Sequence, residues 1–277
     1  MNLQVATEYR LLATEERCTH IVSCDVHDKF GTVYLAETGD RYTVNVNGTV
    51  WRTWRKQQWP FTRRVKWFES DAVLVWITGE GAIVLSRDDT RTLQYGTPSN
   101  IFVSENYAYV TYGEDASSSF ASSPEFSIIS VYSKVNGRVL GLDEVIDNVP
   151  YSGTPNEVSQ ACTSEDVLIF LLDNTPHIWT LDAPSRGVSC IGSLGDLART
   201  LAISVSGQML FLLKSAANEQ HYLEVCRLDP LNVTKLGVVE ALEISTFNPD
   251  RIHGIPGGMF VLSKRSAVTL LKVALPK

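Results

Sequence analysis

Long apolar runs are missing from this 277-residue sequence, and no stretch approaches the roughly 18 apolar residues that a membrane-spanning helix needs. The N-terminal stretch, MNLQVATEYRLLATEERCTH, also lacks a basic segment followed by an apolar one, which is the form of a secretion signal. We therefore expect a soluble, cytoplasmic protein that makes no contact with a membrane.

Cysteine is scarce, and the spacing of the cysteines matches no paired motif. The five cysteines form an odd set without a CxxC pair, and four of them lie in apolar, strand-like runs, where a free cysteine behaves as a small buried hydrophobe. The five histidines form no metal-binding motif, and HExxH, EF-hand, Walker and GxGxxG patterns are absent. We expect reduced cysteines, no metal and no cofactor.

Signatures of nucleophilic catalysis are missing as well, since no GxSxG occurs. Because none of the searched catalytic patterns is present, the sequence favours a protein that is not an enzyme.

Helical periodicity is nearly absent, whereas short apolar runs bounded by turn residues are frequent. The clearest hairpin is DAVLVWITGEGAIVLSRDD, from Asp71 to Asp89, in which Gly79 and Gly81 allow the chain to reverse. A single hairpin cannot bury its own faces, so it has to stack against similar units.

Similar apolar runs recur along the chain with spacings of 40, 36, 59, 42 and 50 residues. The equivalent positions are Val33, Val73, Tyr109, Leu168, Leu210 and Phe260. Each run is preceded by one strand candidate and followed by a third, and in five of the six units a turn such as Asn47-Gly48 leads to a fourth, more polar strand. Four strands per unit, with the second the most hydrophobic, is the pattern of a propeller blade.

The last unit has room for only three strands, and the stretch from Leu3 to Ala13 can supply the fourth, which would remove free sheet edges. We predict an all-β, six-bladed β-propeller that is a single domain over residues 1–277, closed by the N-terminal strand pairing into the last blade, with seven blades as the alternative. The expected blades cover residues 18–56, 62–96, 98–147, 157–192, 198–238, and 249–277 joined to 1–14.

This repeated strand pattern resembles the β-propeller superfamily in general. The Trp-Asp and Gly-His signatures of WD40 repeats are missing, as is the repeated double glycine of kelch repeats, so the resemblance is WD40-like only in its strand pattern. Six-bladed propeller lactonases hold calcium with carboxylates in the channel. Asp25, Glu105 and Asp166 would be the candidates here, which leaves a metal-dependent hydrolase as an alternative function.

The compositional outlier is the segment from Trp51 to Phe68, WRTWRKQQWPFTRRVKWF. It holds six of the 24 basic residues, no acid and four of the six tryptophans, on a chain whose net charge is -7. Tryptophan and arginine are enriched at binding hot spots. We predict that the protein is an interaction module or scaffold subunit that binds an acidic protein partner here. The predicted binding residues are Trp51, Trp54, Arg55, Trp59, Phe61, Arg63 and Arg64.

Two other interpretations of this segment stay open. A single-stranded nucleic acid or another acidic ligand could use the same residues, although the acidic composition argues against a general nucleic-acid binder. Alternatively, the tryptophans pack between blades while the basic side chains reach solvent. Strand alternation would place Trp51, Thr53 and Arg55 on one face, with Arg52 and Trp54 on the other.

Overall fold

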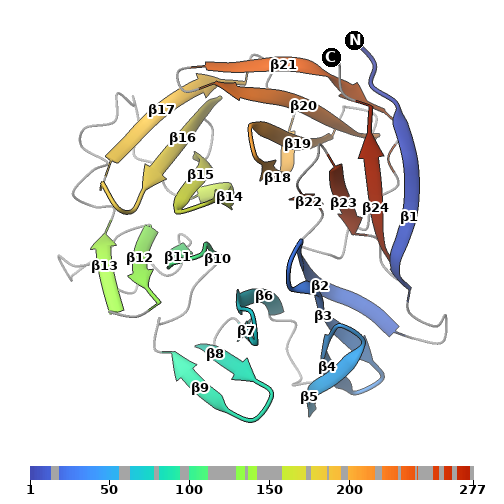
Figure 1. The fold of residues 1–277 in the computed structure, drawn as a ribbon, viewed down its shortest axis with the longest axis vertical. Helices are drawn as coiled ribbons and strands as arrows, with labels where there is room; N and C mark the ends of the chain where they lie inside the picture. The colour runs from blue at the N-terminus through green and yellow to red at the C-terminus, as the bar shows by residue number, and fades with distance from the viewer. Residues whose placement is uncertain are drawn as a thin grey trace. The chain divides into compact units, whose positions relative to one another are not determined.

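The chain folds as a series of four-stranded sheets in a computed structural model of residues 1–277 (Figure 1). The structure describes residues 1–13, 19–55, 63–77, 81–93, 100–111, 129–134, 137–141, 158–172, 176–185, 187–194, 199–215, 220–229, 232–240, 242, 252–255, 259–263 and 267–274. Every secondary-structure element in these ranges is a β-strand, so the predicted all-β class is confirmed. The described ranges contain no helix that could span a membrane.

The described residues form six sheets of four strands each, which we number in chain order. Sheet 1 contains β2 (Thr19–His27), β3 (Gly31–Thr38), β4 (Arg41–Val46) and β5 (Thr49–Arg55). Sheet 2 contains β6 (Arg63–Glu69), β7 (Ala72–Ile77), β8 (Gly81–Ser86) and β9 (Thr90–Leu93). Sheet 3 contains β10 (Asn100–Val103), β11 (Tyr107–Thr111), β12 (Ile129–Ser133) and β13 (Gly137–Gly141).

The remaining sheets follow the same plan. Sheet 4 contains β14 (Val158–Ser164), β15 (Val167–Leu172), β16 (His177–Asp182) and β17 (Gly187–Ser193). Sheet 5 contains β18 (Arg199–Ser206), β19 (Met209–Ser215), β20 (His221–Asp229) and β21 (Asn232–Val239). Sheet 6 contains β22 (Ile252–Ile255), β23 (Met259–Ser263), β24 (Ala267–Val273) and, as its fourth strand, β1 (Val5–Ala13).

The N-terminal strand completes the last sheet, as predicted. In Figure 1, β1 runs beside β24, and the two strands pair antiparallel from Val5 opposite Val273 to Ala13 opposite Ala267. The first three residues of the sequence, which precede β1, extend the contact to sheet 5. Asn2 forms a parallel bridge to Val238, and the Leu3 amide donates to the Val238 carbonyl at 2.7 Å.

Several second strands are almost continuously buried, as the apolar runs predict, whereas in sheet 1 the third strand, β4, is more buried than β3. On β7, Val73, Leu74, Val75 and Trp76 are all at most 1% exposed, and β15 and β19 show the same run of buried residues. Such continuous burial requires apolar partners on both faces of the strand. Neighbouring sheets provide them.

Each described core cluster lies between two sheets. One joins Val33 and Val44 of sheet 1 to Val65, Val73 and other residues of sheet 2. A second joins sheets 5 and 6 and takes in Leu3, and a third joins sheets 3 and 4. Face-to-face packing of four-stranded sheets is what the repeat pattern requires.

The predicted turn at Asn47-Gly48 is also confirmed. Both residues have positive φ, 48° and 80°, which matches the right-handed twist of a two-residue hairpin. The Asn47 amide group also secures the preceding turn, because its Oδ1 accepts from the Thr32 amide at 2.9 Å and its Nδ2 donates to the Phe30 carbonyl at 2.8 Å.

The chain divides into two compact units. The first comprises Met1–Gln94, Ala198–Arg227 and Thr234–Lys277. The second comprises Tyr95–Leu197 and Leu228–Val233. All interactions described below lie within one unit or the other.

Candidate functional site

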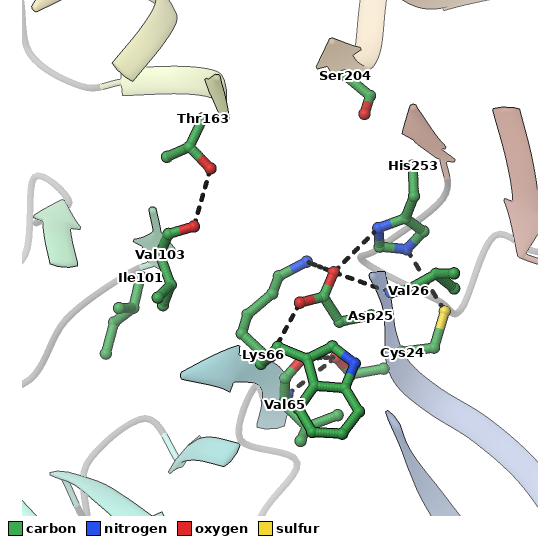
Figure 2. A network of polar contacts seen from close by, with 12 residues as sticks. Cys24, Asp25, Val26, Val65, Lys66, Ile101, Val103, Thr163, Ser204 and His253 are labelled. Carbon is green, nitrogen blue, oxygen red and sulfur yellow. Dashed lines mark hydrogen bonds and ion pairs between the residues drawn. The ribbon is translucent and has the colours of Figure 1, made fainter. Parts of the chain in front are cut away.

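Polar side chains of the innermost strands connect one sheet to the next, and Figure 2 shows this network for β2. The Ser23 hydroxyl accepts a hydrogen bond from the Val65 amide of β6 at 3.0 Å. Two residues later, Asp25 Oδ2 accepts from the Trp67 amide at 2.9 Å. Because residues two apart on a strand share a face, Ser23 and Asp25 both reach toward sheet 2.

The Asp25 carboxylate has two cationic neighbours. Lys66 Nζ lies 3.8 Å and His253 Nδ1 lies 3.3 Å from Asp25 Oδ1 (Figure 2). Burial alone would raise the pKa of Asp25, but the Lys66 charge, the His253 hydrogen bond and the Trp67 amide outweigh it and lower the pKa to about 2. Asp25 is therefore ionised throughout the physiological range.

His253 links the last sheet to the first. Its ring, 7% exposed, contacts Asp25 through Nδ1 and the Cys24 sulfur through Nε2, at 3.5 Å (Figure 2). Burial lowers the pKa of His253, but the interactions with Cys24 and Asp25 dominate and raise it to about 9. At neutral pH the ring is a cation that bridges β22 and β2.

The three carboxylates predicted as calcium ligands, Asp25, Glu105 and Asp166, do not have the surroundings of a cation site. Both Asp25 oxygens accept from donors, and a divalent ion there would face Lys66 and protonated His253. Asp166 accepts from the Ser104 hydroxyl at 3.0 Å and from Asn106 Nδ2 at 2.8 Å, so it fastens the turn after β10 to the turn after β14. Glu105 is exposed in the first of these turns. In the described ranges, no group of three or more His, Cys, Asp or Glu side chains is placed to hold a metal.

This inner network was not among the features predicted from the sequence, although the sequence contains a signal for it. Ser204 and Ser206 on β18 repeat the spacing of Ser23 and Asp25. The Ser204 hydroxyl accepts from the Gly254 amide at 2.5 Å, and the Ser206 hydroxyl donates to the Ile255 carbonyl. Two polar residues at alternate positions of an otherwise apolar first strand mark a connection between sheets.

The basic outer strand of sheet 1, β5, is the part of the predicted binding segment that the structure describes most fully. None of its seven residues is buried. Arg52 is exposed and the Arg55 side chain is 86% exposed, while Trp51 and Trp54 are half-buried. The exposed arginines thus lie next to tryptophans that are partly buried in the protein.

The predicted alternation of faces along this strand is wrong. The pairing of β5 with β4 shifts register between Asn45 opposite Val50 and Val44 opposite Arg52, so Trp51 is the extra residue of a β-bulge. A bulge inserts one residue and cancels the two-residue period. Trp51 and Trp54 consequently both pack against the core between sheets 1 and 2.

The other predicted binding residues have different positions. Trp59 and Phe61 lie outside the described residues, as does the side chain of Arg63 on β6. Arg64 is half-buried, and its guanidinium carbon lies 5.9 Å from the ring centre of the buried Trp76, a cation–π contact. The Arg64 side chain thus packs partly against the interior, whereas the Arg55 side chain projects into solvent.

Comparisons with known proteins agree on the fold. No protein-family model matches the sequence, and no curated protein matches it. Among solved structures, the β-propeller domain of Myceliophteria thermophila Cps50 (Swd1) superposes with a TM-score of 0.61 at 7% identity, covering 98% of this chain and 100% of that one. The WD40 repeats of RRP9 give 0.55 at 8% identity and cover 99% and 100%, and Kluyveromyces lactis Hsv2 gives 0.52 at 9% and covers 88% and 70%. At such low identity the likeness is one of fold, and it shows that this chain has the fold of a β-propeller.

Proposed function

We propose that this protein is a non-enzymatic interaction module, or scaffold subunit, that binds an acidic protein partner through the basic surface around β5. The main observation in favour of this function is that Arg41, Arg52 and Arg55 are exposed on one sheet of a chain whose net charge is -7. Asp40 forms an exposed ion pair with each of Arg41 and Arg55, at 3.8 Å. Exposed ion pairs at this distance hold their partners weakly, so the arginines can exchange Asp40 for other carboxylates.

Support for a protein partner, in preference to a single-stranded nucleic acid, comes from the tryptophans. Base stacking needs an aromatic ring with a free face. Trp51 and Trp54 instead pack against the core between sheets 1 and 2, where they hold the arginine-bearing strand in place. We also include Trp59, Phe61, Arg63 and Arg64 in the proposed surface, because they belong to the same basic, tryptophan-rich segment of the sequence as β5.

Charge reversal tests this function. A fluorescent decaglutamate peptide should bind the wild-type protein, and the double variant R52E/R55E should weaken its binding at least about tenfold, because attraction becomes repulsion at two positions. Fluorescence anisotropy at low and physiological salt measures both affinities, and the wild-type affinity should fall as salt screens the arginines.

The matched control is R227E, which reverses an exposed arginine of sheet 5 and should leave binding within about twofold of the wild type. Equal affinity of wild type and R52E/R55E would contradict the proposed surface. If a labelled oligothymidylate binds more tightly than the peptide, the ligand of this surface is a nucleic acid and not an acidic protein.

A further inference from the structure

Strand β5 ends its sheet with an unpaired edge. The strand order β2-β3-β4-β5 leaves the outer side of β5 without a neighbouring strand among the described residues. The amides and carbonyls on that side have the geometry to pair with another extended chain. Every side chain of β5 is at least partly exposed, and Val50, 57% exposed, is a large apolar residue that faces solvent.

The same fold shows how an outer edge can receive an extended segment. On β21, the outer strand of sheet 5, the Leu3 amide donates to the Val238 carbonyl at 2.7 Å and the Val238 amide donates to the Met1 carbonyl at 3.0 Å. Leu3 is thereby buried in the core between sheets 5 and 6. Gly237 makes room for this, because a Cβ there would lie 2.6 Å from the Met1 carbonyl oxygen.

The charges of β5 define what could be added to it. Beyond the bulge at Trp51, the strand returns to regular pairing from Arg52 opposite Val44 to Arg55 opposite Arg41. Since Arg52 and Arg55 are three residues apart on a regular strand, they project from opposite faces of the sheet. A chain paired alongside would meet both arginines if it carried acids three residues apart.

We propose that the partner binds by strand addition: an extended peptide segment with two acidic residues three positions apart pairs with the outer edge of β5. This inference rests on the proposed function and specifies how the same surface recognises its ligand. The main chain of the segment pairs with the β5 edge, and its two carboxylates contact Arg52 and Arg55. Val50 offers an apolar contact at the start of the strand.

Backbone methylation tests strand addition separately from charge attraction. The probe is an eight-residue peptide of threonine and valine with two glutamates three positions apart, in three forms: unmodified, N-methylated at odd positions, and N-methylated at even positions. A strand paired along one edge uses the amides of alternate residues only. One methylated form should therefore lose affinity at least about tenfold, while the other should stay within about threefold of the unmodified peptide.

The outcomes are distinct. Equal affinity of the two methylated forms, or no binding of the unmodified peptide at millimolar concentration, would overturn strand addition. The effect of R52E/R55E on decaglutamate binding is measured independently. Failure of strand addition therefore leaves the proposed function standing, and only equal decaglutamate affinity of wild type and R52E/R55E contradicts the proposed function. As a second readout, amide hydrogen exchange of residues 49–55 should slow when the unmodified peptide binds and should change less with the same concentration of the methylated form that has lost affinity.

Discussion

At the scale of single residues, His253 couples the stability of the protein to pH. Its pKa is raised to about 9 in the folded protein from an ordinary value of 6.5. A group with a raised pKa stabilises the fold fully below its unfolded value, and this contribution is lost as pH rises through the folded one. The shift corresponds to a stabilisation on the order of 3 kcal/mol.

We therefore expect the free energy of unfolding to fall between pH 6.5 and 9 in the wild type and to change much less over that range in H253Q. Urea denaturation at closely spaced pH values measures this. Parallel pH profiles for the two proteins would show that His253 is not the titrating group.

The pKa of Asp25 is shifted in the opposite direction, so its contribution to stability depends on pH in the opposite way. Its pKa is lowered to about 2 from 3.8, so its contribution is present above pH 3.8 and is lost as pH falls toward 2. The variant D25N keeps an oxygen acceptor for the Trp67 amide but leaves Lys66 and His253 without their carboxylate. We expect D25N to lose about 2–4 kcal/mol at pH 7 and to show a flatter stability profile below pH 3.8, which acid denaturation followed by circular dichroism would test.

At the scale of the strand, the hydroxyls that connect neighbouring sheets are the features to test. Ser23 is fully buried, and S23A would leave the Val65 amide without its hydroxyl acceptor. An unsatisfied buried amide costs about 1–3 kcal/mol. S189A on β17, where the side chain is exposed, should change stability by less than about 0.5 kcal/mol. If the two variants lower the unfolding free energy equally, the Ser23 bridge contributes nothing.

Gly237 on β21 tests the docking of the first three residues. In G237A the new methyl group would collide with the Met1 carbonyl, which belongs to the main chain and cannot turn aside. We expect faster hydrogen exchange at the Val238 amide and a loss of about 1–3 kcal/mol. G187A is the control, because its nearest neighbour is the hydroxyl of Ser185, a side chain that can move. Unchanged exchange at Val238 in G237A would contradict this.

Strands were easier to predict from the sequence than the directions of their side chains. The repeat of apolar runs predicts the second strand of each sheet, and Asn47-Gly48 predicts its hairpin, because burial and turn geometry leave local patterns. The bulge at Trp51 leaves none: it depends on how β5 pairs with β4. The Asp25–His253 contact joins residues far apart in the chain, which no local pattern can bring together.

At the scale of the whole molecule, both ends of the chain build sheet 6. Removal of residues 1–13 would expose the edge of β24 and uncover the part of the sheet 5 core that Leu3 fills. We expect the truncated protein to melt at a lower temperature and to self-associate, since an open edge pairs with other chains. A synthetic peptide of residues 1–13 should restore the melting temperature. A truncated protein that stays monomeric with an unchanged melting temperature would show that β1 is dispensable.

The place of β1 beside β24 also has a consequence for biosynthesis. β1 pairs with β24, and the strands of the five other sheets lie between them in the sequence. While the intervening sheets are being made, β1 has no native partner, and its pairing spans nearly the whole chain, the kind of contact that slows folding most. Sheet 6 is therefore completed only after β24 has been made, and until then a nascent chain carries a strand that chaperones, or other copies of β24, can capture.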